Sequence, residues 1–410
     1  MFVTTILTYS LLFVSLYFEI FLLVAFLERH FARRNTQSGA TTLSSYPSVA
    51  IVVPCFNEEK SLGATLASLL ALDYPKDRFE ILVVDDGSRD NTFAIAKEFE
   101  IDARVRVFHK ENGGKHTAMN LALAHTNADL IGCLDADSIV AKEALLRVVP
   151  VFGNETVAAV TPGIHVKETS NVLQHMQNVE YRLSVFNRFM LAALGSAFIT
   201  PGPFSIFRAS VVRKLGGWRY GHSTEDMEMA LRMQSEGYLI GNAPRAVVHT
   251  SIPRTLKHLF NQRVRWTYGW LRNAVDYRHM IGNRAYGNLG VIVLPSALIS
   301  IAAGIYFFFR IIFELGQAAT HAFLKYQVTG ALPHLAFDPF YLNTSMMWFL
   351  VWFAVALILV LVAAGSFIGT GKRNLPLGTP LFVLFYSLLV PLWLGTAVVR
   401  AIFKTGVQWR

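Results

Sequence analysis

Two aspartates separated by one residue, Asp135 and Asp137, follow an apolar run over 130–134 that is typical of a buried strand. A hard divalent cation that keeps several of its waters needs only one or two carboxylates together with substrate phosphates. Such a cation neutralises a departing diphosphate, so we interpret the pair as a candidate metal site. The alternative interpretation is structural, with Asp137 capping a helix predicted over 138–149.

A second acidic pair, Glu225 and Asp226, lies in a helix predicted over 223–234. A hydroxyl group that attacks a carbon atom must lose its proton, and a positioned carboxylate can accept it. We therefore interpret Asp226 as a candidate general base, with Glu225 raising its pKa through like-charge repulsion. The competing interpretation is a capping box, because Ser223 stands three residues before an acid.

Two glycine-containing clusters also have both a chemical and a structural interpretation. Asp86 belongs to an Asp-Asp-Gly-Ser segment at a strand end, where a carboxylate can bind a base or a ribose. Asp and Gly are also the ordinary residues of turns. Lys115 ends an Asn-Gly-Gly-Lys segment and can face a phosphate, or it can be a solvated loop lysine.

A third cluster, Gln-Arg-Val-Arg-Trp over 262–266, lies in an amphipathic helix predicted over 254–276. Arg265 can clamp a diphosphate, and Trp266 offers a flat apolar face to a sugar ring. The alternative is lipid contact, because Arg snorkels and Trp favours the headgroup region.

Short apolar runs alternate with amphipathic stretches before residue 135. Strands are predicted at 49–53, 80–84, 105–108 and 129–134, and helices at 61–72, 91–99 and 116–125. Nearly all-apolar strands indicate a parallel sheet covered on both faces, and ligands bind beyond the carboxyl ends of such strands. Three of these ends carry polar clusters, at 54–59, 85–88 and 135–137. Downstream, a helix is predicted at 172–194 and a Gly/Pro turn leading into a strand at 200–208.

The two ends of the chain are far more apolar, which indicates membrane spans. Hydrophobic residues make up 53% of the chain and charged residues 16%. Apolar runs lie at 5–27, 289–313, 346–368 and 381–399, with a polar loop at 316–345. Arg29, Arg33 and Arg34 follow the first run and no Lys or Arg precedes it, which excludes a signal peptide and places the next domain in the cytoplasm. Arg400 and Arg410 oppose the resulting C-terminal orientation, so the topology there stays open.

Composition and charge bear on nucleic-acid binding and on the state of the cysteines. The net charge of +9 is explained by basic membrane flanks, and no nucleic-acid motif is present, so nucleic acid is not an expected partner. Cys55 and Cys133 are expected to be small buried hydrophobes. Glu19 lies inside the first apolar run and is a functional candidate by its depth alone.

These patterns divide the chain into five parts. They are an N-terminal span with its basic flank (1–34), a linker (35–48), the catalytic domain (49–250), an interfacial helix (251–285) and C-terminal spans (286–410).

In this order, the motifs resemble those of the processive family-two membrane glycosyltransferases, which include hyaluronan, chitin, cellulose and poly-N-acetylglucosamine synthases. The matching segments are VVPCFNEE, VVDDGS, NGGKHTAMN, DAD, TPGPFSIFR, STED and QRVRW. The complete Q-x-x-R-W together with the spaced aspartates is highly diagnostic of membrane polysaccharide synthases. The resemblance implies an α/β, GT-A-type (Rossmann-like) catalytic domain on the cytosolic side of the plasma (inner) membrane, inserted between transmembrane helices.

The resemblance also implies a role for each motif residue. The residues that would bind the nucleotide-sugar are Pro54, Asn57, Glu58, Asp86, Lys115, Asp135 and Asp137. The last two would also hold Mg²⁺ or Mn²⁺. Asp226, beside Glu225, would be the base of an inverting single displacement. The acceptor and the diphosphate would contact Gly202, Pro203, Gln262, Arg265 and Trp266.

We therefore expect transfer of sugar from a UDP-sugar, with UDP-N-acetylglucosamine the favoured donor, to a growing β-linked polysaccharide. The alternatives are single-sugar transfer to a lipid carrier or glycolipid, and a non-catalytic sensor of nucleotide-sugar. Only one span precedes the catalytic domain, and no regulatory β-domain follows the last span, unlike in a typical bacterial cellulose synthase. Four spans are few for building a polymer channel within one chain. An accessory subunit or self-association could therefore contribute to such a channel.

Overall fold

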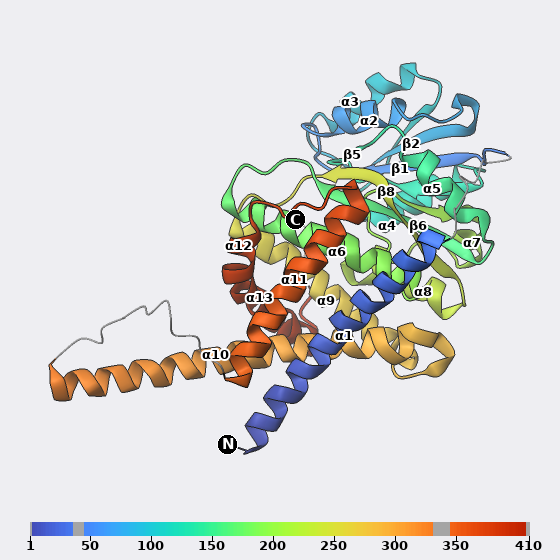
Figure 1. Cartoon of the computed structure of the whole chain (residues 1–410). Coiled ribbons are helices and arrows are strands. Elements are labelled where there is room, and N and C mark those ends of the chain that lie inside the picture. Colours follow the sequence, from blue (N-terminus) through green and yellow to red (C-terminus); the bar gives the residue numbers. More distant parts are fainter. Residues whose placement is uncertain (1, 36–44, 331–344, 407–410) are drawn as a thin grey trace.

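The computed structural model of the chain describes residues 2–35, 45–330 and 345–406. It has two parts, an α/β domain and a group of long helices that lies beside it (Figure 1). Most of the linker expected over 35–48 and half of the loop expected over 316–345 fall outside the described residues.

The α/β domain is built on one sheet of eight strands in the order β3-β2-β1-β4-β7-β6-β8-β5. The strands are β1 (Val49–Cys55), β2 (Phe79–Asp85), β3 (Val105–His109), β4 (Leu130–Cys133), β5 (Ile139–Val140), β6 (Val157–Val166), β7 (Ser205–Arg208) and β8 (Leu239–Thr250). The four predicted strands form the parallel half. The other half is mixed, since β7 runs antiparallel to both β4 and β6, β6 runs parallel to β8, and β5 runs antiparallel to β8.

Alternation along β1 shows why the parallel half is buried on both faces. Val49, Ile51 and Val53 pack in the core that contains α2 (Leu62–Leu70). The intervening Ala50 and Val52 pack in the core that contains α4 (Lys115–Ala124). Burying one such large apolar side chain contributes about 1.5–3 kcal/mol, so the two helix layers fix the sheet between them.

The remaining helices divide into those of the domain and those of the apolar group. The domain contains α3 (Thr92–Glu98), α5 (Ala144–Val148), α6 (Val172–Ala193), α7 (Ala209–Lys214), α8 (Glu225–Ser235) and α9 (Leu256–Asp276). The apolar group contains α1 (Phe2–Asn35), α10 (Leu294–Thr329), α11 (Met346–Thr370), α12 (Thr379–Leu381) and α13 (Ser387–Phe403). Short 3-10 turns are Lys76–Arg78, Phe99–Ile101, Val149–Gly153, Gly221–Ser223, Arg278–Met280 and Arg284–Tyr286, and π-helical turns are Leu289–Val293 and Phe382–Tyr386.

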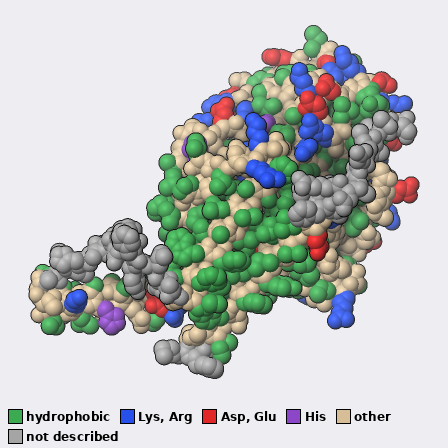
Figure 2. All heavy atoms as spheres, viewed as in Figure 1, with side chains coloured by type: hydrophobic (Ala, Val, Ile, Leu, Met, Phe, Trp, Pro, Cys, Tyr) green, Lys and Arg blue, Asp and Glu red, His purple; other side chains and the backbone are tan. Residues whose placement is uncertain are grey.

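Four helical stretches of the described chain are long and apolar enough to cross a membrane. They are Thr4–Arg29, Leu289–Thr329, Met346–Thr370 and Thr379–Phe403. Figure 2 shows hydrophobic side chains gathered over this group, whereas Lys, Arg, Asp and Glu gather over the α/β domain. The four predicted apolar runs are thus all helical.

Close helix contacts join the apolar group to the domain. Helix α11 packs on α6, and α13 packs on α9. A Cβ at Gly365 of α11 would lie 2.0 Å from the carbonyl oxygen of Arg182 on α6, so only glycine allows the two backbones to approach this closely. Helices α6 and α9 are therefore seated directly on the apolar helices.

Several expectations from the sequence are corrected. The helix expected over 138–149 is replaced by β5 and the short α5, so no helix begins after Asp137 for it to cap. Strand β1 continues through Pro54 to Cys55, because Pro54 is placed opposite Val84 on β2. The loop expected from residue 316 is helical to residue 329, since α10 simply continues.

Candidate active site

A narrow pocket lies at the carboxyl edge of the sheet and brings together side chains from α4, from the Gly/Pro turn and from α8. Its lining residues are Lys115, Met119, Cys133, Thr200, Pro201, Gly202, Ser205, Phe207, Trp218, Glu225 and Asp226. Four of these, Lys115, Gly202, Glu225 and Asp226, were predicted as site residues from the sequence, and together they span more than a hundred positions of the chain. Both cysteines of the chain are free and buried, as expected.

Lys115 is the central cation of this pocket. It is the first residue of α4, directly after Gly114, whose φ of 88° is in the left-handed region that favours glycine. Its Nζ donates to Asp135 Oδ1 at 2.5 Å and lies 3.6 Å from Glu225 Oε1. Burial opposes the charge of Lys115, but the Asp135 and Glu225 carboxylates outweigh burial and raise its pKa well above the usual range.

Gly202 closes the pocket over this ion pair. A Cβ at Gly202 would lie 2.3 Å from Lys115 Nζ and 2.7 Å from both carboxylate oxygens of Asp135. The position therefore requires glycine so that the backbone can reach the charged atoms. Pro203 lies in the same turn, and the next residue, Phe204, donates its N–H to the carbonyl of Cys133 at 2.6 Å, which ties the turn to the end of β4.

Asp226 lies in the first turn of α8, and one carboxylate oxygen accepts from the backbone N–H of Met227 at 2.9 Å. Burial and then the charge of Glu225 raise the pKa of Asp226 to about 7, against the opposing effects of Lys115 and Arg265. A carboxylate with a pKa near neutrality is well suited to accept a proton. The capping-box interpretation is not supported, because Thr224 is the N-cap residue and makes no side-chain capping hydrogen bond.

The turn before Asp226 is strained and is held by α9. His222 and Ser223 have φ values of 54° and 67°, a region that non-glycine residues rarely adopt. Arg265 donates to the carbonyl of Ser223 at 3.0 Å, and Asn273 donates to Thr224 Oγ1 at 2.9 Å. The helix that carries Q-x-x-R-W thus also positions the candidate base.

Gly269 completes this contact between α9 and the turn. A Cβ there would lie 2.2 Å from Thr224 Oγ1. Neither Gly269 nor Asn273 was singled out from the sequence, because an isolated glycine or asparagine within a helical pattern gives no local signal of a tertiary contact.

The predicted nucleotide residues meet at the ends of β1 and β2. Asp86 accepts from the backbone N–H groups of Gly113 and Gly114 at 3.0 and 2.8 Å, and therefore fixes the loop that leads to Lys115. Asn57 accepts from the backbone of Arg89 at 2.8 Å, which joins the two strand ends. Two further contacts complete this cluster: Glu58 accepts from Ser61 Oγ at 2.7 Å, and Pro54 is placed beside β2.

Asp135 and Asp137 are the candidate metal ligands. Burial, followed by the charges of Asp135 and Glu58, raises the pKa of Asp137 to about 6. Ser138 Oγ donates to Asp137 at 3.1 Å. No group of three or more His, Cys, Asp or Glu residues that could hold a metal occurs in the described parts of the chain. Two closely placed, mutually repelling carboxylates fit a cation that takes its other ligands from water and phosphate.

The residues of the Q-x-x-R-W segment that were predicted to contact the acceptor lie on α9. Arg265 approaches the turn before Asp226, as described above. Gln262 accepts from Arg263 at 2.7 Å, and Trp266 is 37% exposed. Trp266 therefore retains surface that a ligand can cover.

The family profile described as glycosyltransferase like family 2 matches residues 47–269, more than half of the chain. The chain belongs to glycosyltransferase family 2. The match includes every residue of the pocket and extends into α9 beyond Trp266, so the resemblance based on the motifs is confirmed.

Curated relatives of this glycosyltransferase include poly-beta-1,6-N-acetyl-D-glucosamine synthases. That of Staphylococcus aureus (strain COL) is 31% identical over 267 residues, covering 63% of this chain and 64% of the relative. That of Staphylococcus epidermidis is 31% identical over 224 residues, covering 54% of each. The similarity thus spans less than two thirds of the length of these relatives.

Among solved structures, the fold is similar to that of mannosyltransferase PcManGT from Pyrobaculum calidifontis in complex with GDP-Man and Mn²⁺. The TM-score is 0.59 at 18% identity, over 96% of this chain and 99% of the other. At this identity the likeness concerns the fold alone, and it confirms the GT-A-type α/β architecture.

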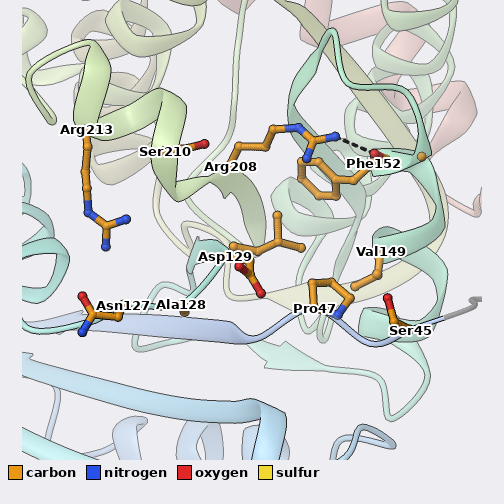
Figure 3. Close-up of a pocket in the computed structure, with 12 residues that line it drawn as sticks. Ser45, Pro47, Asn127, Ala128, Asp129, Val149, Phe152, Arg208, Ser210 and Arg213 are labelled. Atoms are coloured by element: carbon orange, nitrogen blue, oxygen red, sulfur yellow. Dashed lines mark hydrogen bonds between the residues drawn. The ribbon is translucent and has the colours of Figure 1, made fainter.

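A second cavity of this glycosyltransferase, of about 490 Å³, lies near the opposite edge of the sheet (Figure 3). Arg208 and Arg213 line it, yet both donate to backbone carbonyl groups, those of Phe152 and Thr126. Asp129 accepts from Ser48 at 2.7 Å. These charged side chains of the cavity make hydrogen bonds within the protein, so we do not assign the reaction to this cavity.

Substitution of Gly269 tests whether α9 positions the base of this glycosyltransferase. In Gly269→Ala the new methyl group meets Thr224 and displaces the turn before Asp226. Misplacement of a catalytic group by about 1 Å can cost ~10²-fold, so we expect kcat to fall by that order while KM for the sugar nucleotide changes little. Steady-state kinetics on purified protein would measure both constants.

The matched control is Gly316→Ala, in which a helical glycine with no neighbour within 4 Å receives the same methyl group. It should retain the wild-type rate. A wild-type kcat for Gly269→Ala would show that the contact with Thr224 does not position the base.

Proposed function

We propose that this glycosyltransferase transfers sugar from a UDP-sugar, with UDP-N-acetylglucosamine as donor, to a growing β-linked polysaccharide with inversion at the anomeric carbon. The observation that carries the proposal is the pocket in which Asp226, with a pKa raised to about 7, lies beside the Lys115–Asp135 ion pair. The curated synthases support the choice of donor and product.

In this mechanism Asp226 accepts the proton of the acceptor hydroxyl as the oxygen attacks the anomeric carbon. Lys115 lies 2.5 Å from Asp135 and 3.6 Å from Glu225, and it would balance the negative charge of the departing diphosphate. Arg265 holds the turn before Asp226 and can also contact the diphosphate. Asp86 keeps the glycine-containing loop of Lys115 in place during donor binding.

Asp135 and Asp137 would hold Mg²⁺ or Mn²⁺ together with the donor diphosphate. A bound divalent cation supplies electrostatic stabilisation of the leaving group. The presence of Mn²⁺ in the PcManGT complex supports the choice of a divalent cation.

We further propose that the chain lies in the plasma (inner) membrane, with the α/β domain in the cytoplasm and the apolar helices in contact with lipid. Support comes from the four long apolar helices and from the hydrophobic face in Figure 2. The five-part division at residues 34, 48, 250 and 285 belongs to this proposal. A partner subunit or self-association would widen any path for the product.

The direct test incubates membranes containing the protein with radiolabelled UDP-N-acetylglucosamine and Mn²⁺, with and without UDP-glucuronic acid. High-molecular-weight label supports a polymerase, and dependence on the second sugar would indicate hyaluronan. Label confined to the organic extract would support single-sugar transfer to a lipid instead. Absence of label with UDP-sugars but incorporation from GDP-mannose would overturn the proposed donor.

The pH dependence of kcat/KM tests the role of Asp226 through its charge. The base must be deprotonated, so kcat/KM should rise with pH up to a plateau above about 7. Because Glu225 raises this pKa, whereas Lys115 and Arg265 lower it, Glu225→Gln should move the acidic limb to lower pH. A limb that stays in place, or moves to higher pH, would contradict the assignment.

A further inference from the structure

Arg263, which lies between the motif residues of Q-x-x-R-W, contacts two of them. Its Nη1 donates to Gln262 Oε1 at 2.7 Å. The centre of its guanidinium group lies 4.3 Å from the ring centroid of Trp266, within cation–π distance. One planar side chain thus bridges the amide and the indole that the acceptor would meet.

Two side chains from other helices hold Arg263 in this position. Glu180 of α6 accepts from Arg263 Nη2 at 2.5 Å, and the same carboxylate oxygen accepts from Tyr386 Oη at 2.7 Å. Arg263 is 4% exposed and Tyr386 is 3% exposed, so these two residues are shielded from water, whereas the Glu180 side chain is 30% exposed. Tyr386 belongs to the apolar stretch Thr379–Phe403. The arrangement therefore links a candidate membrane span, through α6, to α9.

Stability alone does not explain such a group. Taking the Arg263 guanidinium out of water is costly, and well-packed apolar side chains of similar volume are often equally stabilising. A planar cation held by a carboxylate, in contrast, fixes the orientation of the ring that it covers. Trp266 remains 37% exposed, so the indole keeps surface for a ligand while Arg263 covers part of it.

The charges of Arg263 and Glu180 also act on the next residue of α6. Tyr181, one helical position after Glu180, interacts electrostatically with Arg263, Glu180 and Asp137. Burial is the main reason that the pKa of Tyr181 is raised to about 12, so this hydroxyl stays protonated. Tyr181 therefore adds no charge to the Arg263–Glu180 pair.

We propose that Arg263 is a positioning residue, held by Glu180 and Tyr386, that fixes Gln262 and Trp266 for binding of the glycan acceptor. This inference rests on the proposed function, because it assigns Trp266 to an acceptor. It goes beyond that function by giving a role to a non-motif arginine and to a tyrosine of a membrane-type helix.

The test compares Arg263→Lys and Tyr386→Phe with the wild type, using UDP-N-acetylglucosamine and a short β-linked N-acetylglucosamine oligosaccharide as acceptor. Lysine keeps the charge but loses the planar stack, so KM for the acceptor should rise about tenfold, which corresponds to one cation–π contact of moderate strength. Tyr386→Phe keeps the packing and loses one hydrogen bond, so a rise of about threefold is expected. KM for the donor should stay within about twofold.

Tyr306→Phe is the matched control, because it removes a hydroxyl whose partner, Thr8 at 2.6 Å, belongs to α1 and not to α9. It should leave both KM values unchanged. Equal changes in donor and acceptor KM for the Arg263 and Tyr386 variants would indicate a general structural role and overturn the proposal.

Hydroxyl-radical labelling of Trp266 gives a readout that does not depend on turnover. Labelling should increase in Arg263→Lys and Tyr386→Phe and stay constant in Tyr306→Phe. Unchanged labelling in the first two variants would overturn the positioning role. If the wild type extends no acceptor while the labelling pattern is as expected, the proposed function fails and the positioning of Trp266 by Arg263 stands.

Discussion

Replacing Asp226 by Asn is expected to remove transfer almost completely while UDP binding is retained. The amide has nearly the same size as the carboxylate but cannot accept the acceptor proton. General-base catalysis typically contributes about 10²–10⁴-fold to a rate, so kcat should fall by at least that order. The ion pair of Lys115 with Asp135 remains in place, and the backbone bond to Met227 can persist with the amide oxygen. Radiolabel incorporation would measure the rate, and titration calorimetry with UDP would measure the binding.

Asp102→Asn provides a matched control for the same change of charge. Asp102 pairs with Arg104 at 2.8 Å just before the amino end of β3, and its loss should leave transfer unaffected because the candidate site lies at the carboxyl ends of the strands. Preserved turnover in Asp226→Asn would remove Asp226 as the base. Loss of both turnover and UDP binding would instead indicate that the variant had collapsed the pocket.

The parallel half of the fold was predictable because its signals are local. An apolar run such as that of β1 is followed by a helix and a polar strand end, and this pattern needs no knowledge of distant residues. Strands β6 and β8 were missed because Pro162, Gly163 and Pro244 interrupt their apolar pattern. The structure accommodates these residues through a register shift between β6 and β8 at Pro162 and Gly163. Such irregularities depend on the partner strand and are not encoded in the local sequence.

In the candidate site, too, residues in short motifs could be predicted, whereas residues that act through tertiary contacts could not. Asp135, Lys115 and Asp226 were predicted from short motifs, and the structure places all three around one pocket. The residues that hold those groups were not predicted, because Gly269 and Asn273 act on a turn about fifty positions earlier. Arg263 likewise depends on Glu180 and on Tyr386, more than a hundred positions further along the chain. Contacts of this kind appear only when the chain is folded.

Removing divalent metal is expected to stop transfer, and Asp137→Asn is expected to produce a similar defect. Asp135 and Asp137 are the only pair of acidic side chains with one-residue spacing in the three strand-end clusters, and burial together with mutual repulsion raises the pKa of Asp137 to about 6. A bound cation is worth several kcal/mol of charge stabilisation, and each 1.36 kcal/mol is tenfold in rate. We therefore expect the rate to fall by about 10²-fold or more after chelation, with recovery on addition of excess Mn²⁺ or Mg²⁺.

The defect in Asp137→Asn should differ from that in Asp226→Asn in its response to metal. The first variant loses a ligand, so the metal concentration for half-maximal activity should increase and added Mn²⁺ should restore part of the rate. The second retains both candidate ligands, so no concentration of Mn²⁺ should restore it. Full activity of the wild type in the presence of chelator would show that Lys115, which already pairs with Asp135, balances the diphosphate charge without a metal ion. That outcome would leave the Asp226 assignment intact and would restrict Asp137 to a role in binding the sugar nucleotide.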